Sequence, residues 1–89
     1  MKKVRVSIIF CGRRKPVTGF VERKTDILAV TPSQDTGDAD RFKVTERKSG
    51  LSISFGGSYA FDAACTLRHE MEPLADWRAL IALRKRFVP

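Results

Sequence analysis

The feature that most constrains the fold is a stretch from position 3 to position 10 in which every second residue is apolar. The apolar members are Val4, Val6, Ile8 and Phe10, and the polar members are Lys3, Arg5 and Ser7. A period of two places successive side chains on opposite faces of an extended chain, so this stretch predicts a strand with one buried face. The polar residues of the other face are expected to point to solvent.

Turn-forming residues divide the next part of the chain into further short strands. Residues 12–16 contain Gly and Pro and predict a turn whose tip carries three cations. A second strand is predicted at 17–22 and a third at 27–31, where β-branched residues are frequent. Residues 32–40 read as a polar loop.

A second hairpin and two helices complete the predicted elements. Residues 41–45 and 51–55 alternate around a Gly-containing turn, which predicts two paired strands. Ser58 is a candidate N-cap for a helix from about residue 59 to residue 71. Pro73 suits the first turn of a second helix that reaches Phe87.

This order of elements predicts an α+β fold. One domain, residues 1–89, is expected to hold an antiparallel sheet of four to five strands in two hairpin units. Two C-terminal helices are expected to pack on one face of that sheet. The apolar side of the first strand is predicted to face the helices, which leaves the opposite face uncovered.

Positive charge is segregated along the chain rather than dispersed. Residues 1–24 contain eight Lys or Arg and one acid, and their net charge of +7 equals that of the whole protein. Such segregation creates a field that attracts polyanions or acidic partners. The predicted binding residues lie on the uncovered sheet face and its turns: Lys3, Arg5, Arg13, Arg14, Lys15, Arg41, Lys43, Arg47 and Lys48.

Arg68 and Arg84 each fall inside the apolar arc of a predicted helix. An ion pair or an extended aliphatic stem explains such positions, and Glu72 lies four residues beyond Arg68. A functional role for either arginine is the alternative.

No grouping of residues in the sequence indicates an enzyme, a cofactor site or a metal site. Cys65 and His69 have the spacing of two ligands or of a nucleophile and its base, but a closed zinc site needs four ligands. The aspartates of the polar loop do not follow the EF-hand pattern. A nuclease built on Asp62, His69 and Glu70 is disfavoured, because Glu70 lies on a different side of the helix.

The two cysteines, Cys11 and Cys65, lie far apart and match no disulfide framework, which fits a reducing compartment. No stretch approaches the roughly 20 apolar residues of a membrane helix. We therefore expect a cytoplasmic protein with no membrane association.

Two functional hypotheses follow from the charge pattern. The first is a non-enzymatic protein that uses a basic sheet face and basic turns to engage nucleic acid or a nucleoprotein complex. The alternative is a small inhibitor or adaptor, of the type used by phages and mobile elements, that docks on an acidic surface of a host protein. The oligomeric state is open, because strand edges or a helix face can each pair between copies.

Overall fold

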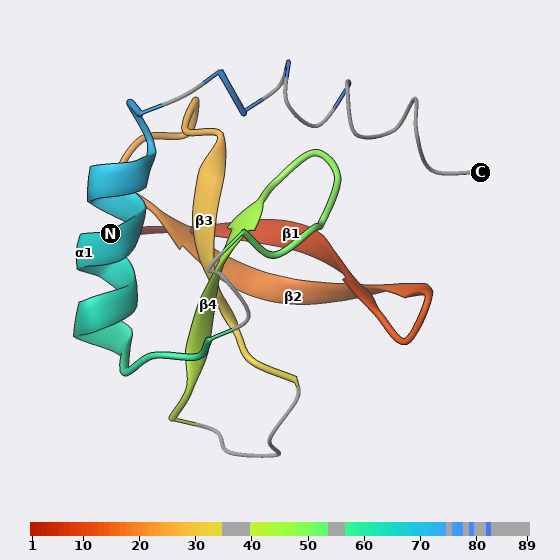
Figure 1. The fold of residues 1–89 in the computed structure, drawn as a ribbon. Coiled ribbons are helices and arrows are strands. Elements are labelled where there is room, and N and C mark those ends of the chain that lie inside the picture. The colour runs from red at the N-terminus through yellow and green to blue at the C-terminus, as the bar shows by residue number, and fades with distance from the viewer. Residues whose placement is uncertain (35–39, 54–56, 75, 78, 80–81, 83–89) are drawn as a thin grey trace.

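The computed structural model describes residues 1–34, 40–53, 57–74, 76, 77, 79 and 82. Four strands and one helix make up its regular elements (Figure 1). They are β1 (Lys2–Phe10), β2 (Arg13–Val21), β3 (Leu28–Pro32), β4 (Phe42–Glu46) and α1 (Phe61–Met71). The strands form one sheet in the order β1-β2-β3-β4, and each neighbouring pair is antiparallel.

The predicted α+β class is confirmed, with a correction to the number of helices. One helix, α1, packs against the sheet in the described part of the chain, where the sequence predicted two. The stretch 73–87 that was assigned to the second helix lies largely outside the described residues. Likewise, the strand predicted at 51–55 is represented in the described residues only by a bridge between Ser52 and Thr45.

The first hairpin has a tighter turn than the sequence predicted. Cys11 and Gly12 form the whole connection, with positive φ angles of 51° and 76°, and Phe10 pairs with Arg13. A two-residue turn with both φ angles positive matches the twist of the strands that it joins. The residues that were expected to form a basic turn tip, Arg13 to Lys15, therefore belong to β2.

Pro16 lies within β2 because its position does not require a backbone donor. It is opposite Ser7, at an alternate position that makes no hydrogen bond with β1. The register continues through Gly19 without a bulge. Gly19 provides room, since a Cβ there would lie 2.7 Å from Cγ2 of Val6.

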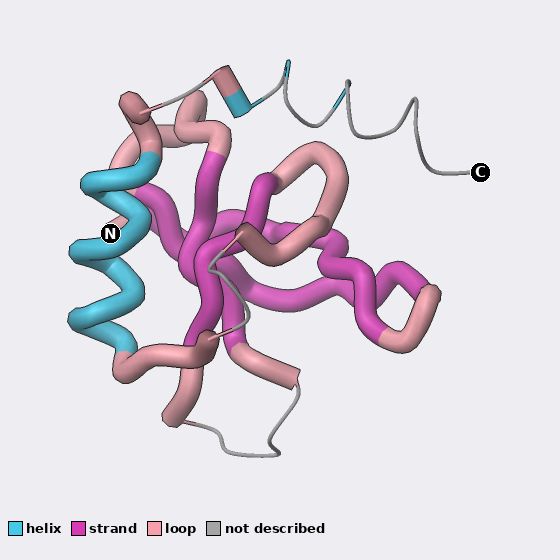
Figure 2. The backbone as a smooth tube through the Cα atoms, viewed as in Figure 1, coloured by secondary structure: helices cyan, strands magenta, loops and turns pink. Residues whose placement is uncertain are grey.

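The sheet is strongly coiled, so its two hairpins cross at a steep angle (Figure 2). β2 pairs with β3 only at Phe20 and Val30, whereas β3 and β4 pair at five positions. The far end of β1 meets the chain after β4, where the Ile9 amide donates to the Gly50 carbonyl at 3.0 Å. This contact joins the β1 edge of the sheet to the turn that follows the opposite edge strand, β4.

The sheet has a hydrophobic core on each face. Val6, Ile8, Val21 and Ala29 form one buried cluster. Leu28, Val44 and Met71 form the other, between the opposite sheet face and α1.

The apolar side of β1 therefore does not face the helix, which corrects the prediction. Phe20 lies on the helix side and packs edge-on against Phe61, with ring centroids 5.0 Å apart. Val21, the next residue in β2, belongs to the cluster that contains Val6. Because side chains alternate along a strand, Val6 and α1 are on opposite faces. Coiling supplies Val6 with a core that a flat sheet lacks.

The segment before α1 is attached to the sheet edge. Tyr59 and Phe42 exchange two backbone hydrogen bonds of 2.8 Å, so Tyr59 is not the first helical residue. The N-cap residue is Ala60 rather than Ser58. Phe61 then packs against Phe42 as well, with ring centroids 5.1 Å apart.

We predict that Gly50→Ala destabilises the protein more than Gly12→Ala does. Both glycines have a φ of 76°, but only at Gly50 would a Cβ collide with backbone, at the Ser7 carbonyl. We expect Gly12→Ala to lower the free energy of unfolding by about 1 kcal/mol, and Gly50→Ala by about 2 to 4 kcal/mol. Urea unfolding measures both, and equal losses would contradict the close approach of this turn to β1.

Candidate functional site

Three predicted cations lie on one exposed face of the β1–β2 hairpin. Lys3 and Arg5 alternate along β1, and Arg14 is opposite Ile9, which places it on the same face. The exposed hydroxyl residues Ser7 and Thr18 share this face. We call these five residues the basic strip.

The other two cations of the hairpin point to the opposite face. Arg13 pairs with Phe10 and Lys15 pairs with Ile8, on the side of the sheet that holds the Val6 cluster. Both are exposed, and the Lys15 ammonium donates to the Gln34 side chain at 2.6 Å. The hairpin is therefore cationic on both faces towards its tip.

Two arginines predicted to bind a partner also make hydrogen bonds within the fold. The Arg41 guanidinium donates to the Ser58 carbonyl at 2.5 Å and to the Ser58 hydroxyl at 3.2 Å. Arg47 Nη1 donates to the carbonyls of Lys24 and Asp26 at 2.7 and 2.8 Å. Each arginine secures a segment that has no regular structure of its own.

The second-hairpin lysines also differ from the prediction. Lys43 pairs with the buried Thr31, so it lies on the opposite sheet face from Arg5 and is half-buried. Lys48 is exposed in the turn after β4. The nine predicted residues thus do not converge on one uncovered face, because the coiled sheet places the two hairpins in different orientations.

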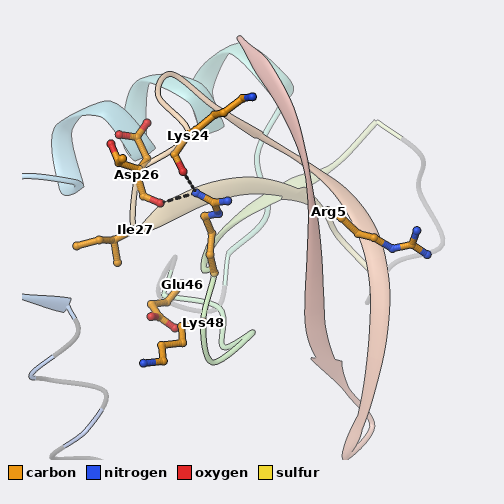
Figure 3. A pocket seen from close by; sticks show the side chains of 8 residues that line it. Arg5, Lys24, Asp26, Ile27, Glu46 and Lys48 are labelled. Carbon is orange, nitrogen blue, oxygen red and sulfur yellow. Dashed lines mark hydrogen bonds between the residues drawn. The ribbon is translucent and has the colours of Figure 1, made fainter.

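A hollow of about 450 Å³ lies between β1 and two turns (Figure 3). One turn precedes β3, and the other follows β4. Its lining residues are Arg5, Lys24, Thr25, Asp26, Ile27, Glu46, Arg47 and Lys48. In Figure 3, the side chains of Lys24 and Lys48 extend in opposite directions, and that of Arg5 points away from the other labelled residues. A second hollow, of about 390 Å³, shares Arg5 and lies over the hairpin near Lys3.

The two acids of the first hollow are engaged within the fold. A Glu46 carboxylate oxygen accepts from the Ser49 amide at 2.5 Å, and Glu46 is only 1% exposed. Asp26 accepts from the amides of Glu22 and Arg23 at 3.0 and 2.8 Å. No ion pair joins either acid to a cation of the lining among the described residues. The four cations of the lining outnumber its two acids, so the hollow keeps a positive balance of charge.

Sequence reasoning missed Lys24 as a member of this group. Its neighbours in the hollow, Arg47 and Lys48, come from a turn more than 20 positions away in the sequence. The only available signal was the Arg23-Lys24 pair in a polar segment.

Arg68 is the buried centre of an ion-pair network that includes Asp26, a residue of the hollow. It is 2% exposed, and its guanidinium lies 2.7 Å from Glu22, 3.2 Å from Asp26 and 3.1 Å from Glu72. The structural explanation given by the sequence, an ion pair with Glu72, is confirmed. Arg84 lies outside the described residues.

Glu72 extends this network to the backbone of the β2–β3 turn. Its carboxylate accepts from the Ile27 amide at 3.1 Å and from the Leu28 amide at 3.0 Å. The carbonyls of the same turn accept from Arg47, as described above. Donors and acceptors of the turn are thus satisfied from opposite sides, which fixes one wall of the hollow.

The Cys65 and His69 side chains each have a different partner. His69 Nδ1 lies 2.7 Å from Glu22, and the Cys65 sulfur lies 3.1 Å from the Met1 sulfur. Burial, reinforced by the negative charge of Asp62, raises the pKa of the Cys65 thiol, which disfavours the reactive thiolate. The described residues include no group of three His, Cys, Asp or Glu side chains placed to hold a metal ion.

None of the described helical residues belong to a segment long and apolar enough to cross a bilayer.

We predict that Glu22→Gln weakens the pH dependence of stability in acid. Hydrogen bonds from Arg68 and His69 hold the pKa of Glu22 below its usual range. The resulting stabilisation is complete well above pH 4.5 and is lost as the pH falls through the lowered pKa. The gap in unfolding free energy between the wild type and Glu22→Gln should therefore narrow from pH 7 to pH 3. Glu70→Gln, at an exposed site on α1, is the control, and a gap that stays constant with pH would contradict the assignment.

Comparison of the chain with models of protein families, with curated proteins and with solved structures finds no match.

Proposed function

We propose that this protein is a small non-enzymatic binding protein whose β1–β2 hairpin engages the phosphate backbone of nucleic acid. The observation that carries the proposal is that residues 1–21 contain no acid. Every cation of that hairpin is exposed: Lys2, Lys3, Arg5, Arg13, Arg14 and Lys15. Attraction to a polyanion is thus unopposed along the whole hairpin.

The other groups of the basic strip suit the same ligand. Ser7 and Thr18 present hydroxyl groups beside Arg5, and hydroxyls, guanidinium groups and ammonium groups are the usual donors to phosphate. A two-stranded ribbon of this kind has dimensions that the major groove of a duplex accepts. The cations on both faces of the hairpin would then contact phosphates on either side of the groove.

The aromatic residues favour recognition without base reading. Phe20, Phe42 and Phe61 pack against one another rather than presenting flat rings to solvent. Stacking on aromatic rings is the usual means of binding single-stranded bases. We therefore propose binding through charge and shape, with little dependence on sequence.

The second candidate function is an inhibitor or adaptor that docks on an acidic protein partner. The hollow bordered by Lys24, Arg47 and Lys48 favours this candidate, because it lies apart from the tip of the hairpin. Capture from lysate with and without nuclease separates the two functions, since only partners held by nucleic acid are lost on digestion.

We predict that the triple variant Arg13→Ala, Arg14→Ala, Lys15→Ala binds a 20-base-pair DNA duplex more weakly than the wild type. Binding measured by fluorescence anisotropy across a NaCl series should weaken linearly on a logarithmic scale. Loss of three phosphate contacts should reduce the magnitude of that slope by about 2 to 3. A wild-type affinity that does not change with salt would contradict nucleic-acid binding.

A control variant removes the same charge elsewhere. Arg23→Ala, Lys24→Ala, Lys48→Ala lacks three exposed cations outside the hairpin. We expect its salt slope to remain within about 1 of the wild type, because only long-range attraction is lost. Equal effects of the two triple variants would show that net charge, rather than the hairpin, determines binding.

A further inference from the structure

One edge of β1 has unpaired backbone groups. The Ile9 amide points away from β2, because it donates to Gly50 rather than to the neighbouring strand. Outward and inward groups alternate along an antiparallel strand, so Lys3 and Arg5 also direct their amides and carbonyls away from β2. Within the described residues, these groups of Lys3 and Arg5 have no backbone partner. Two donors and two acceptors are therefore available along this edge.

The open part of the edge borders the basic hollow. Gly50 closes the edge at Ser7 and Ile9, while Arg5 lines the hollow together with the turns after β2 and β4. The Arg5 side chain points away from the other labelled residues in Figure 3, as expected for a strand whose backbone, rather than side chain, faces its edge. The edge and the hollow are thus parts of one surface.

The opposite wall of the hollow carries fixed positive charge. Arg47 is held by Nη1, which donates to two carbonyls at 2.7 and 2.8 Å, while its Nε and Nη2 have no partner among the described residues. Lys24 and Lys48 are exposed beside it. A partner lying against the edge would therefore meet three cations on its other side.

We propose that the β1 edge and this hollow bind an extended acidic segment of another protein as an added strand. The segment would form backbone hydrogen bonds with Lys3 and Arg5, and its carboxylates would face Lys24, Arg47 and Lys48. The hollow, at about 450 Å³, is within the range of roughly 300–1,000 Å³ typical of ligand sites. This inference does not depend on nucleic-acid binding by the hairpin.

Charge identifies the occupant. Antiparallel pairing of two copies about Arg5 would place the two Arg5 side chains opposite each other, and like charges in that position are destabilising. A phosphate backbone lacks the alternating amides and carbonyls that the edge can pair with. An acidic peptide satisfies both the edge and the cations.

The other edges in the described part of the chain are less suited to an added strand. The outer edge of β2 contains Pro16, which has no amide to donate. The edge of β4 is occupied at Phe42 by Tyr59 and at Thr45 by Ser52. The β1 edge is therefore the preferred place for strand addition.

The test uses a blocked six-residue peptide of alternating valine and glutamate, with a valine–lysine peptide as its control. We expect the acidic peptide to slow amide hydrogen exchange of Lys3 and Arg5 at least about tenfold at saturation, as new backbone hydrogen bonds form. Unchanged exchange at these two amides would overturn the proposal, as would an equal effect of the basic peptide or chemical-shift changes confined to Arg13–Lys15.

Charge reversal tests the wall of the hollow. Lys24→Glu with Lys48→Glu should weaken peptide binding about tenfold or more, because two attractions become repulsions. Arg13→Glu with Arg14→Glu changes the net charge equally but lies at the tip of the hairpin, so its effect should be less than about threefold. Equal weakening by the two variants would overturn the site.

Substitution of Arg5 tests the backbone edge separately from charge. Arg5→Ala removes the side chain and keeps the amide, whereas Arg5→Pro removes both. We expect Arg5→Pro to bind the acidic peptide about fivefold more weakly than Arg5→Ala, because one backbone hydrogen bond is lost. Both variants should keep the wild-type amide chemical shifts in β3, which shows that the fold is preserved. Equal affinities of the two variants for the acidic peptide would then overturn strand addition.

Discussion

The structure depends on one buried cation, Arg68 of α1. Its guanidinium gathers Glu22 from the end of β2, Asp26 from the following turn and Glu72 from the end of the helix. A charge that is 2% exposed is tolerated only when it is paired, and three carboxylates that approach it bring three separate segments together. The helix is thereby fixed to the turn as well as to the sheet.

The same contacts determine the shape of the hollow, because they hold the β2–β3 turn that lines it. Glu72 satisfies the amides of Ile27 and Leu28, and Arg47 satisfies carbonyls of the same turn, so the wall of the hollow is set from both sides. The lining of the hollow contains four cations and two acids, so its field is positive on balance. The hydrogen bonds of Glu72 and Arg47 inside the fold therefore determine where the charges of the hollow lie.

The sequence predicted the features that depend on local patterns, but it did not predict those that depend on the coiling of the sheet. Alternation correctly placed Val6 inside and Arg5 outside, and the spacing of Arg68 and Glu72 correctly indicated an ion pair. It did not predict that Val6 lies on the face opposite α1, because periodicity shows which residues share a face but not what covers that face. The sequence assigned Pro16 to a turn, because proline is usually excluded from strands. Whether a strand can accept proline at a given position depends on the pairing register, which the sequence alone does not show.

The binding residues show the same division between local and long-range information. Lys3, Arg5 and Arg14 lie on one face because they belong to one hairpin, whereas Lys24 and Lys48 line one hollow only through the arrangement of distant turns. Arg41 and Arg47 were predicted as surface cations from charge alone. Their contacts with carbonyls are a property of the folded chain, and no pattern in the sequence indicates them.

Urea unfolding and native-state hydrogen exchange of Arg68→Met test the central role of this arginine most directly. Removing one partner from a buried ion pair leaves the others uncompensated, so we predict a loss of about 3 to 5 kcal/mol in unfolding free energy. The Ile27 and Leu28 amides should lose their protection at the same time. A loss below about 1 kcal/mol, with both amides protected as in the wild type, would contradict the account.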